Sequence, residues 1–543
     1  MFQHYKRPLA VLALFSLAAC GGGSSSSSST PPVVTVPPAV VAPQSGAAIL
    51  TTIVGVGDSL TAGTQSGVTM GEKGSNPLSA YPGNITPPTQ ENGFWSLLFQ
   101  QAKGVPPLFM YDPNNSPLPL IHQPGIGSQL VLATPAAGKP FISTHPSCDA
   151  FNAAGFSRTS ALTTVRINGA STVLDTAVPG ITVHEALYMN SPLTGPPPPP
   201  DGSGNCPGYA ASALDPTAGP LQSVVAGESS LYYPILGGFA GSPTMVNAAA
   251  GLHPTLATVW LGANDLLKFI FSGGNPILSD SPAQMQADMT TIIATMQNSG
   301  ARVVVANLPD ILSTSQFFPG GVPNANPQAF DNQFVTFATQ LGVPAPAAKA
   351  YADALTAQMA QAPPPAGTAF GPAYGYGVTS AGYLTESGFF AVFAAGVGEL
   401  KAGAPPSLPD LDQGKPGSGL GGLYINDTFA VSVRGLNTAY NGAIGAAAAA
   451  QSAPLVDIAS IFAKFQTVTY PGQVLSPKCC FLVFGGGLQS FDGLHPSNTG
   501  YAFIANEFIK TINAAYSLTI PAVNVMAVYK GTAPYLFPDP YAQ

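Results

Sequence analysis

The sequence predicts an α/β protein built on a mostly parallel central sheet. Short apolar stretches rich in β-branched residues alternate with longer stretches of helical character, which is the pattern of strands joined by helices. The composition is that of a packed protein, because 45% of the 543 residues are hydrophobic and only 8% are charged. The 60 glycines and 56 prolines indicate that much of the remaining chain forms turns and loops.

Four segments have the composition of buried parallel strands. The first is 47–56, a run of apolar and β-branched residues that leads into a glycine. The others are 257–261, 302–308 and 454–458. A strand that is covered on both faces has a nearly continuous apolar sequence instead of an alternating one. These four segments are therefore expected to form the centre of the sheet.

Helices are expected at 284–298 and 429–450, each directly before a predicted strand, and again near the C-terminus. Residues 497–499 have side chains that cap helices. The apolar residues that follow recur at helical spacing: Tyr501, Ile504, Phe508 and Ile512. Pro496 disfavours helical backbone at the preceding residue. His495 is therefore expected in a loop immediately before a C-terminal helix.

Residues 47–543 are expected to form one domain, because the candidate catalytic residues lie near its two ends. Insertions rich in Pro and Gly are expected near 81–143, 192–241 and 309–422. The last insertion contains two helix-like pieces, at 345–360 and 389–400.

The N-terminus has the features of an export signal. A basic pair precedes a short apolar run that is too short to span a bilayer. The run ends in Leu17-Ala18-Ala19-Cys20, which resembles a bacterial lipobox, in which the cysteine is acylated and becomes the new N-terminus. Residues 1–20 are expected to be a lipoprotein signal peptide and Cys20 the lipidation site. An ordinary secretory signal with a chance cysteine is the alternative.

Residues 21–46 are rich in Gly, Ser and Pro and are expected to be a tether that holds the domain away from a surface. Gly21, instead of an aspartate, follows the cysteine, which in Gram-negative lipoproteins favours export to the outer membrane. The expected location is therefore the bacterial cell envelope, with membrane attachment through the lipidated Cys20.

Four cysteines remain after Cys20: Cys148, Cys206, Cys479 and Cys480. An even number in an exported chain suggests disulfides. Adjacent Cα atoms are only about 3.8 Å apart, below the usual range for a disulfide. Four cysteines allow three connectivities, and we expect Cys148 to pair with Cys206, because both lie in polar segments rich in Pro and Gly. Buried free thiols are the alternative. None of the cysteines has the spacing of a metal site.

Three stretches carry residues with catalytic chemistry. Ser59 follows the first predicted strand and supplies a hydroxyl nucleophile, which needs an adjacent base. Asp492 and His495 are close enough along the chain for the carboxylate to orient the imidazole that would act as this base. Asn264 follows the second predicted strand and can donate an amide hydrogen to an oxyanion. The parts of a serine hydrolase are therefore present.

Other residues and motifs point elsewhere. Asp265 is expected to be structural and not catalytic. His184 precedes Glu185, but the second histidine of a zinc protease motif is missing. The sequence has no Gly-x-Ser-x-Gly elbow, no phosphate-binding loop and no dinucleotide fingerprint.

The ordered motifs resemble those of the GDSL, or SGNH, hydrolase family. They are Gly57-Asp58-Ser59-Leu60, Gly262-Ala263-Asn264-Asp265 and Asp492-Gly493-Leu494-His495-Pro496, and Ala177-Val178-Pro179-Gly180 is the best match to a fourth. The resemblance covers about 47–518. It implies a three-layer α/β/α sandwich with long loop and helical insertions. It also implies an oxyanion hole formed by the Ser59 and Gly180 N–H groups and Asn264.

The expected function is hydrolysis of a carboxylic ester by a Ser59–His495–Asp492 triad without a metal or cofactor. The apolar, aromatic-rich insertions favour a substrate with an apolar acyl group. An O-acetyl esterase acting on glycans is the alternative enzyme, and a surface binding lipoprotein with a silent site is a further alternative. The net charge of −8 argues against nucleic acid as a partner. The oligomeric state is left open.

Overall fold

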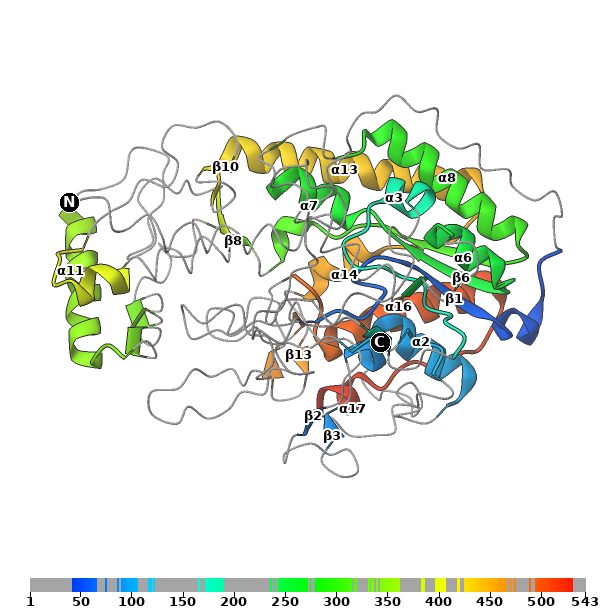
Figure 1. Ribbon diagram of the computed structural model, residues 1–543, viewed down its shortest axis with the longest axis horizontal. Coiled ribbons are helices and arrows are strands. Elements are labelled where there is room, and N and C mark those ends of the chain that lie inside the picture. The colour runs from blue at the N-terminus through cyan, green and yellow to red at the C-terminus, as the bar shows by residue number, and fades with distance from the viewer. Residues whose placement is uncertain are drawn as a thin grey trace.

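The computed structural model shown in Figure 1 describes a defined part of the chain. The described residues are 42–65, 74–75, 85–86, 89–105, 116–119, 121–122, 165–166, 171–189, 235–236, 239, 243–271, 274, 279–314, 317–319, 331–332, 334–335, 338–339, 342–361, 382–385, 396–406, 418–419, 424–465, 469–470, 473–474, 488–489 and 494–530.

The centre of the molecule is a parallel sheet with the strand order β1-β6-β7-β12. Its strands are β1 (Ile53–Gly57), β6 (Leu256–Trp260), β7 (Arg302–Ala306) and β12 (Leu455–Val456). β1 pairs with β6 in parallel, and Gly57 lies opposite Trp260. Every residue of β1 and β6 is buried, as expected for strands covered on both faces.

The four predicted strands are all present, but the first, third and last are shorter than predicted. Residues 46–50 form the 3₁₀ helix η1 (Gly46–Leu50) and not the start of β1. The backbone N–H of Thr52 bonds the side chain of Thr255 at 2.8 Å, and its carbonyl accepts from Leu256 at 3.1 Å. The partner strand begins only at Leu256, so no neighbour remains for an earlier start of β1.

A further segment follows the outer edge of β1. The Gly55 N–H donates to Leu174 O at 2.9 Å, and Gly55 O accepts from the Thr176 N–H at 2.9 Å. The Val178 N–H then donates to Gly57 O at 3.1 Å. These bonds extend the parallel pairing beyond the four named strands and bring residue 180 toward the carboxyl end of β1.

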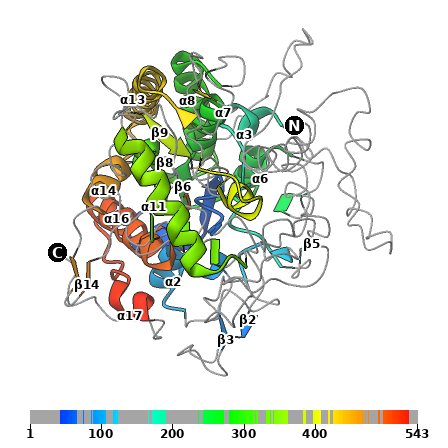
Figure 2. The same cartoon turned by 90° about the vertical axis from the view of Figure 1, so that its left-hand side faces the viewer.

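Helices cover both faces of the sheet, as Figure 1 and Figure 2 show. α8 (Pro282–Asn298) and α13 (Asp427–Ala450) pack against each other over one face, with α3 (Val183–Tyr188) and α6 (Met245–Gly251) beside α8. α2 (Phe94–Lys103) and α16 (Asn498–Tyr516) pack together over the opposite face. The prediction of an α/β fold with a parallel sheet is therefore confirmed.

The predicted helices are present with boundaries close to those expected. Ser281 caps α8 by accepting from the Gln284 N–H at 3.1 Å, and Asn426 caps α13 by accepting from the Phe429 N–H at 2.9 Å. Ser497 caps α16 through the Gly500 N–H at 3.2 Å. A side-chain cap satisfies backbone donors that have no partner within the helix.

The remaining elements are shorter or lie away from the central sheet. The helices are η3 (Thr89–Asn92), α7 (Ala263–Phe271), η6 (Ile311–Ser313), α11 (Ala345–Gln361), α14 (Ile458–Phe465) and α17 (Val525–Lys530). A small antiparallel sheet has the order β10-β11-β9-β8, formed by β8 (Phe317–Pro319), β9 (Tyr383–Thr385), β10 (Ser418–Gly419) and β11 (Tyr424–Ile425). Three antiparallel pairs are β2 (Gly74–Ser75) with β3 (Ile85–Thr86), β4 (Ile121–His122) with β5 (Val165–Arg166), and β13 (Thr469–Tyr470) with β14 (Gln473–Val474).

The insertion near 309–422 therefore carries α11 and three strands of the small sheet. Its second expected helix is described at 396–401. Most of the insertions near 81–143 and 192–241, the signal peptide at 1–20 and the tether up to residue 41 lie outside the described residues. Within the described residues, no helix combines the length and apolar character needed to cross a membrane.

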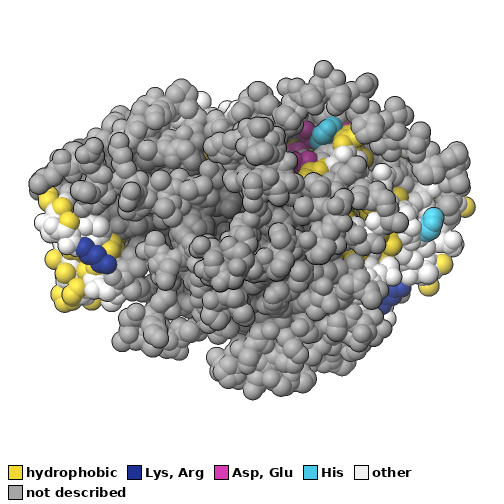
Figure 3. All heavy atoms as spheres, viewed as in Figure 1, with side chains coloured by type: hydrophobic (Ala, Val, Ile, Leu, Met, Phe, Trp, Pro, Cys, Tyr) yellow, Lys and Arg dark blue, Asp and Glu magenta, His cyan; other side chains and the backbone are white. Residues whose placement is uncertain are grey.

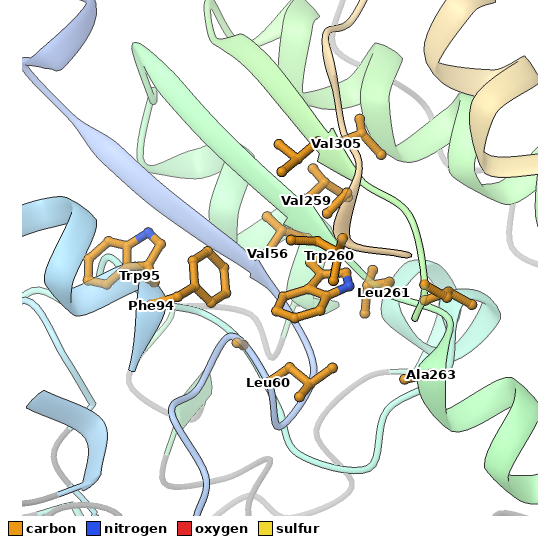
Figure 4. Packing of buried hydrophobic residues seen from close by; sticks show 14 of the residues in the cluster. Val56, Leu60, Phe94, Trp95, Val259, Trp260, Leu261, Ala263 and Val305 are labelled. Carbon is orange, nitrogen blue, oxygen red and sulfur yellow. The ribbon is translucent and has the colours of Figure 1, made fainter. Parts of the chain in front are cut away.

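Aromatic side chains fill the core between the sheet and the helices α2 and α16. The ring of Phe94 stacks on Phe508 with centroids 4.4 Å apart and meets Trp260 edge-on at 5.3 Å. All three side chains are buried. Figure 4 shows Phe94 and Trp260 close to Val56 and Leu60, at the end of β1 that leads into the residue 59 turn. The aromatic core therefore supports the turn directly.

We expect Phe508→Ala to lower the free energy of unfolding by about 3–5 kcal/mol, because it removes a buried ring and leaves a cavity. Lys510→Ala on the same helix is the matched control, since its exposed side chain should change stability by less than about 0.5 kcal/mol. Chemical denaturation of both variants measures the difference. Equal denaturation midpoints for the two variants would show that the ring contributes little to the core.

Candidate active site

Ser59 lies in a tight turn at the carboxyl end of β1. The turn is helix-like, because Asp58 O accepts from the Thr61 N–H at 3.1 Å and from the Ala62 N–H at 3.0 Å. The Asp58 carboxylate also accepts from the Leu60 N–H at 2.9 Å. These bonds fix the backbone on both sides of Ser59, whose side chain is half-buried.

Gly57 allows the turn to fold back over the end of the strand. A Cβ atom at this position would lie 2.0 Å from the Thr61 hydroxyl oxygen and 2.9 Å from Trp260 O. Both distances are shorter than any van der Waals contact, so only glycine fits here. The glycine that precedes the Asp58-Ser59 pair is thus required by packing.

His495 is placed by the loop that leads into α16. The Ser497 N–H donates to Leu488 O at 2.9 Å, and Pro496 pairs with Gln489 in an isolated antiparallel bridge. Gly500 permits this close approach, because a Cβ atom there would lie 2.1 Å from Leu488 O. The sequence-based expectation that His495 precedes a C-terminal helix is confirmed.

Two hydrogen bonds tie the Ser59 turn to α16. Tyr501 Oη donates to Thr64 O at 2.8 Å, and Gln65 Nε2 donates to Asn498 Oδ1 at 2.7 Å. Thr64 and Gln65 directly follow the turn, while Asn498 and Tyr501 lie in the first turn of α16. The sequence analysis did not predict that these four residues connect the Ser59 turn to α16, because this role depends on contacts between distant segments.

Two segments that are far apart in the sequence meet at Ser59 and His495. Ser59 Oγ lies 2.8 Å from His495 Nε2, which is hydrogen-bond distance. His495 is only 9% exposed. In such a pair the serine hydroxyl is the nucleophile, and the imidazole nitrogen removes its proton during attack. The structure thus places the predicted nucleophile and the predicted base in contact.

Asn264 and Gly180 lie near the same edge of the sheet. Because β1 and β6 are parallel with Gly57 opposite Trp260, the segments after both strands leave the sheet at the same end. Asn264 is the second residue of α7 and is buried, and its Nδ2 donates to Ile181 O at 3.0 Å. A side-chain amide has two N–H groups, so one remains for another acceptor. Gly180 has φ of +87°, a conformation that favours glycine.

Asp58 is a buried carboxyl group that the sequence analysis did not consider as a site residue. One oxygen, Oδ1, accepts from the Leu60 N–H, and within the described part of the chain Oδ2 has no hydrogen-bond partner. Burial raises the pKa of Asp58 to about 7, and the Leu60 hydrogen bond and the charge of His495 act in the opposite direction. Its place beside Ser59 in the sequence was the available signal.

Other predicted site residues lie outside the described residues: Asp492, Cys20, Cys148 and Cys206. The proposed orientation of His495 by Asp492 and the Cys148–Cys206 disulfide therefore stay predictions. His184 is described, and its Nδ1 lies 2.8 Å from Asp288 Oδ2 on α8. Among the described residues, no three His, Cys, Asp or Glu side chains come together as a metal site requires.

We expect the stability of the protein to fall between about pH 4 and pH 7 because of Asp58. Its pKa is about 7 in the folded protein and about 3.9 in an unfolded chain. A raised pKa means that folding favours the protonated form, so stability is lost as pH rises through this window, by on the order of 4 kcal/mol. Asp58→Asn keeps an acceptor for Leu60 and should not show this loss.

Thermal unfolding of the wild type and Asp58→Asn at a series of pH values tests the expectation. Asp353→Asn is the control, because it removes an exposed carboxylate that pairs with Lys349. The wild-type melting temperature should fall relative to Asp58→Asn as pH rises, while Asp353→Asn should follow the wild type. Parallel curves for the wild type and Asp58→Asn would contradict a raised pKa.

The site combines a hydroxyl–imidazole contact, a buried amide donor and a glycine with positive φ at one edge of a parallel sheet. This is where ligands bind in open α/β folds. No protein-family model matches the chain, and no curated protein or solved structure is significantly similar to it. The interpretation of this site therefore depends on its residues and their geometry.

Proposed function

We propose that the protein is a serine hydrolase of carboxylic esters, of the SGNH type. The single observation that carries this proposal is the 2.8 Å contact between Ser59 Oγ and His495 Nε2. A free serine hydroxyl is a weak nucleophile, and an imidazole within hydrogen-bond distance activates it. The two residues belong to segments far apart in the chain, and two other hydrogen bonds hold those segments together.

In the proposed mechanism, neutral His495 accepts the Ser59 proton at Nε2 while Ser59 Oγ attacks the ester carbonyl carbon. The carbonyl oxygen becomes an oxyanion. When the tetrahedral intermediate collapses, the bond to the alcohol oxygen breaks, and His495 gives its proton to that oxygen. Water then attacks the acyl-enzyme with His495 as the base, and the acid leaves as Ser59 recovers its proton.

The proposed oxyanion hole consists of the Ser59 and Gly180 N–H groups and the Asn264 amide. Fixed donors aimed at the developing charge stabilise the transition state, because they need no rearrangement during the reaction. Asn264 suits this role, since it is buried and one of its N–H groups is anchored on Ile181 O. The 174–178 segment hydrogen-bonds along β1 and leads directly to Gly180.

Asp492 is proposed to orient His495 through the second ring nitrogen. The three-residue spacing from Asp492 to His495 allows such a contact across a turn. Asp58 is a second carboxyl group in the field of His495. In its ionised form it would also favour the imidazolium that forms during attack.

A three-layer α/β/α arrangement of the SGNH type is part of this proposal, supported by helices over both faces of the sheet. We also propose that Cys20 is lipidated and anchors the protein in the outer membrane of a bacterial envelope. The motif at 17–20 and the Gly/Ser-rich tether support this anchor. Several acyl chains give stable attachment, whereas a single chain binds a membrane only marginally.

We expect the wild type to hydrolyse soluble chromogenic esters, with a preference for acyl chains longer than acetyl. Ser59→Ala should abolish both turnover and covalent labelling by a fluorophosphonate, because the nucleophile is removed. Kinetics across a series of acyl lengths, with labelling detected by mass spectrometry, measures both effects.

Ser460→Ala is the matched control for this experiment. The Ser460 hydroxyl also contacts an ionisable side chain, Asp457, at 2.5 Å, but it lies outside the proposed site. This variant should be labelled like the wild type. Labelling that persists in Ser59→Ala would identify another nucleophile. A preference for acetate would favour an O-acetyl esterase, and the absence of turnover and labelling in the wild type would favour a silent binding protein.

We expect Asn264→Ala to lower kcat by about 10²–10³-fold with little change in KM, because an oxyanion donor acts mainly in the transition state. Asn307→Ala is the matched control. Asn307 also follows a central strand, β7, but its amide donates to Asp457 Oδ1 at 2.9 Å. Steady-state kinetics on variants with normal melting temperatures decides the matter. Full kcat in folded Asn264→Ala would remove this residue from the oxyanion hole.

A further inference from the structure

Two carboxyl groups face each other behind the candidate oxyanion hole. Asp265 lies in the first turn of α7 and is fully buried, and Asp280 lies just before α8 and is half-buried. The two side chains interact, because each carboxyl group shifts the pKa of the other, and each has one buried oxygen that accepts no hydrogen bond within the described part of the chain. Two carboxylate oxygens can form a hydrogen bond only if one of them carries a proton.

The hydrogen bonds around the pair are consistent with a shared proton. Among the described residues, neither Asp265 Oδ1 nor Asp280 Oδ2 has a donor from any other group. The second oxygen of Asp265, Oδ2, accepts from the Val183 N–H at 3.1 Å. A proton between the two carboxyl groups would satisfy both buried oxygens at once, which removes the cost of leaving them without a partner.

The pair connects the two segments that carry the proposed oxyanion donors. Asp265 is on α7, next to Asn264, and it holds the first residue of α3, which begins three residues after Gly180. Asn264 itself donates to Ile181 O, directly before α3. The position of Asn264 relative to Gly180 therefore depends on the contact between the starts of α7 and α3, with Asp265 at its centre.

Other contacts fasten the same two helices. Lys268 Nζ on α7 lies 2.9 Å from Glu185 Oε1 on α3, and the Lys268 side chain is only 3% exposed. Tyr440 Oη on α13 donates to Asp280 O at 2.6 Å, which holds the second carboxyl group in place. If the two carboxyl groups moved apart, the Lys268–Glu185 ion pair and the Tyr440–Asp280 hydrogen bond would be strained.

Several charged groups surround the pair and affect its titration. Burial raises the pKa of Asp265 well above its ordinary range, and Asp280 raises it further, while the Val183 N–H and Lys268 act in the opposite direction. Burial also raises the pKa of Asp280, as does Asp288 on α8, and His184 on α3 opposes this. In Figure 3, acidic side chains and a histidine are visible together, at the position of α3 in Figure 1.

We propose that Asp265 and Asp280 form a proton-sharing carboxyl pair that positions Asn264 and the Gly180 segment, so that the oxyanion hole is intact only while the pair keeps its proton. The inference rests on the ester hydrolase function proposed above. Asp265 and Asp280 are positioning residues, since they act through Asn264 and do not touch the substrate. Deprotonation of the pair would therefore lower the activity at alkaline pH, an effect that the titration of His495 alone would not produce.

The direction of the pH effect follows from the raised pKa values. Folding favours the protonated form of the pair, so its contribution to stability is complete at acidic pH and is lost as pH rises through the pKa of the folded pair. Above that pH the two neighbouring carboxylates repel each other. Asn264 then moves away from the position in which it donates to the oxyanion.

The test compares Asp265→Asn and Asp280→Asn with the wild type. Each variant replaces one carboxyl group by an amide of the same shape, whose N–H donates to the remaining carboxylate at every pH. The wild-type kcat should fall on the alkaline side by up to about 10²-fold, the value of one oxyanion donor, with little change in KM. Both amide variants should keep a level kcat over the same range.

A second readout does not require catalysis. The melting temperature of the wild type should fall from neutral to alkaline pH relative to both amide variants. The control variant Asp353→Asn, which removes an exposed carboxylate, should follow the wild type. Asp265→Ala should lower kcat at all pH values, because alanine can supply neither the shared proton of the carboxyl pair nor the amide N–H of the Asn variant. If Asp265→Asn does not fold, Asp280→Asn provides the same comparison.

The inference is wrong if both amide variants lose kcat at alkaline pH as the wild type does, or if the wild type shows no alkaline loss. In either case, ester turnover and fluorophosphonate labelling of Ser59 would remain, and the proposed function would stand. If the wild type shows neither turnover nor labelling, the proposed function fails and the catalytic role of the pair fails with it. The pH dependence of melting would then report on the carboxyl pair alone.

Discussion

The hydrogen bond between Ser59 and His495 joins a turn near the start of the domain to a loop near its end, and the other features of the site depend on it. Its 2.8 Å length requires β1 and α16 to lie in a defined relation. The aromatic contact between Phe94 and Phe508 holds α16 against α2, below the sheet. The hydrogen bonds of Tyr501 with Thr64 and of Gln65 with Asn498 then hold the start of α16 beside the Ser59 turn. The site is thus a consequence of how the C-terminal helix packs on the sheet.

Buried carboxyl groups are a recurring cost in this protein. Only 8% of the residues are charged, yet Asp58, Asp175 and Asp265 are all buried, and burial raises the pKa of each one. An ionised carboxylate is unstable away from water unless donors surround it. Asp58 and Asp175 each accept from a backbone N–H two residues ahead, which fixes a turn beside β1. These groups contribute to the shape of the site at a cost in stability.

The strand and helix pattern was predictable because it depends on local composition. Apolar, β-branched runs marked β1, β6 and β7, and capping residues marked the start of α16. Strand ends were harder to predict, because a strand continues only as far as its neighbour allows. Residues 46–50 have strand-like composition but form η1, since β6 offers them no partner. The small sheet in the 309–422 insertion had no clear sequence signal, because its strands are two or three residues long.

The sequence by itself determined the α/β class with its parallel sheet, and it identified Ser59, Asn264, Asp492 and His495 as candidate residues from the chemistry of their side chains and their order along the chain. Gly180 became a candidate only through the resemblance of 177–180 to a family motif. Only the tertiary structure decided that Ser59 and His495 lie in contact and that Asn264 is anchored on Ile181. It also decided that Asp58 Oδ2 receives no hydrogen bond from the described residues and that Asp265 interacts with Asp280. The physical reason is that burial and hydrogen bonding between distant segments arise only when the whole chain has packed, whereas residue type and local periodicity are written in the sequence.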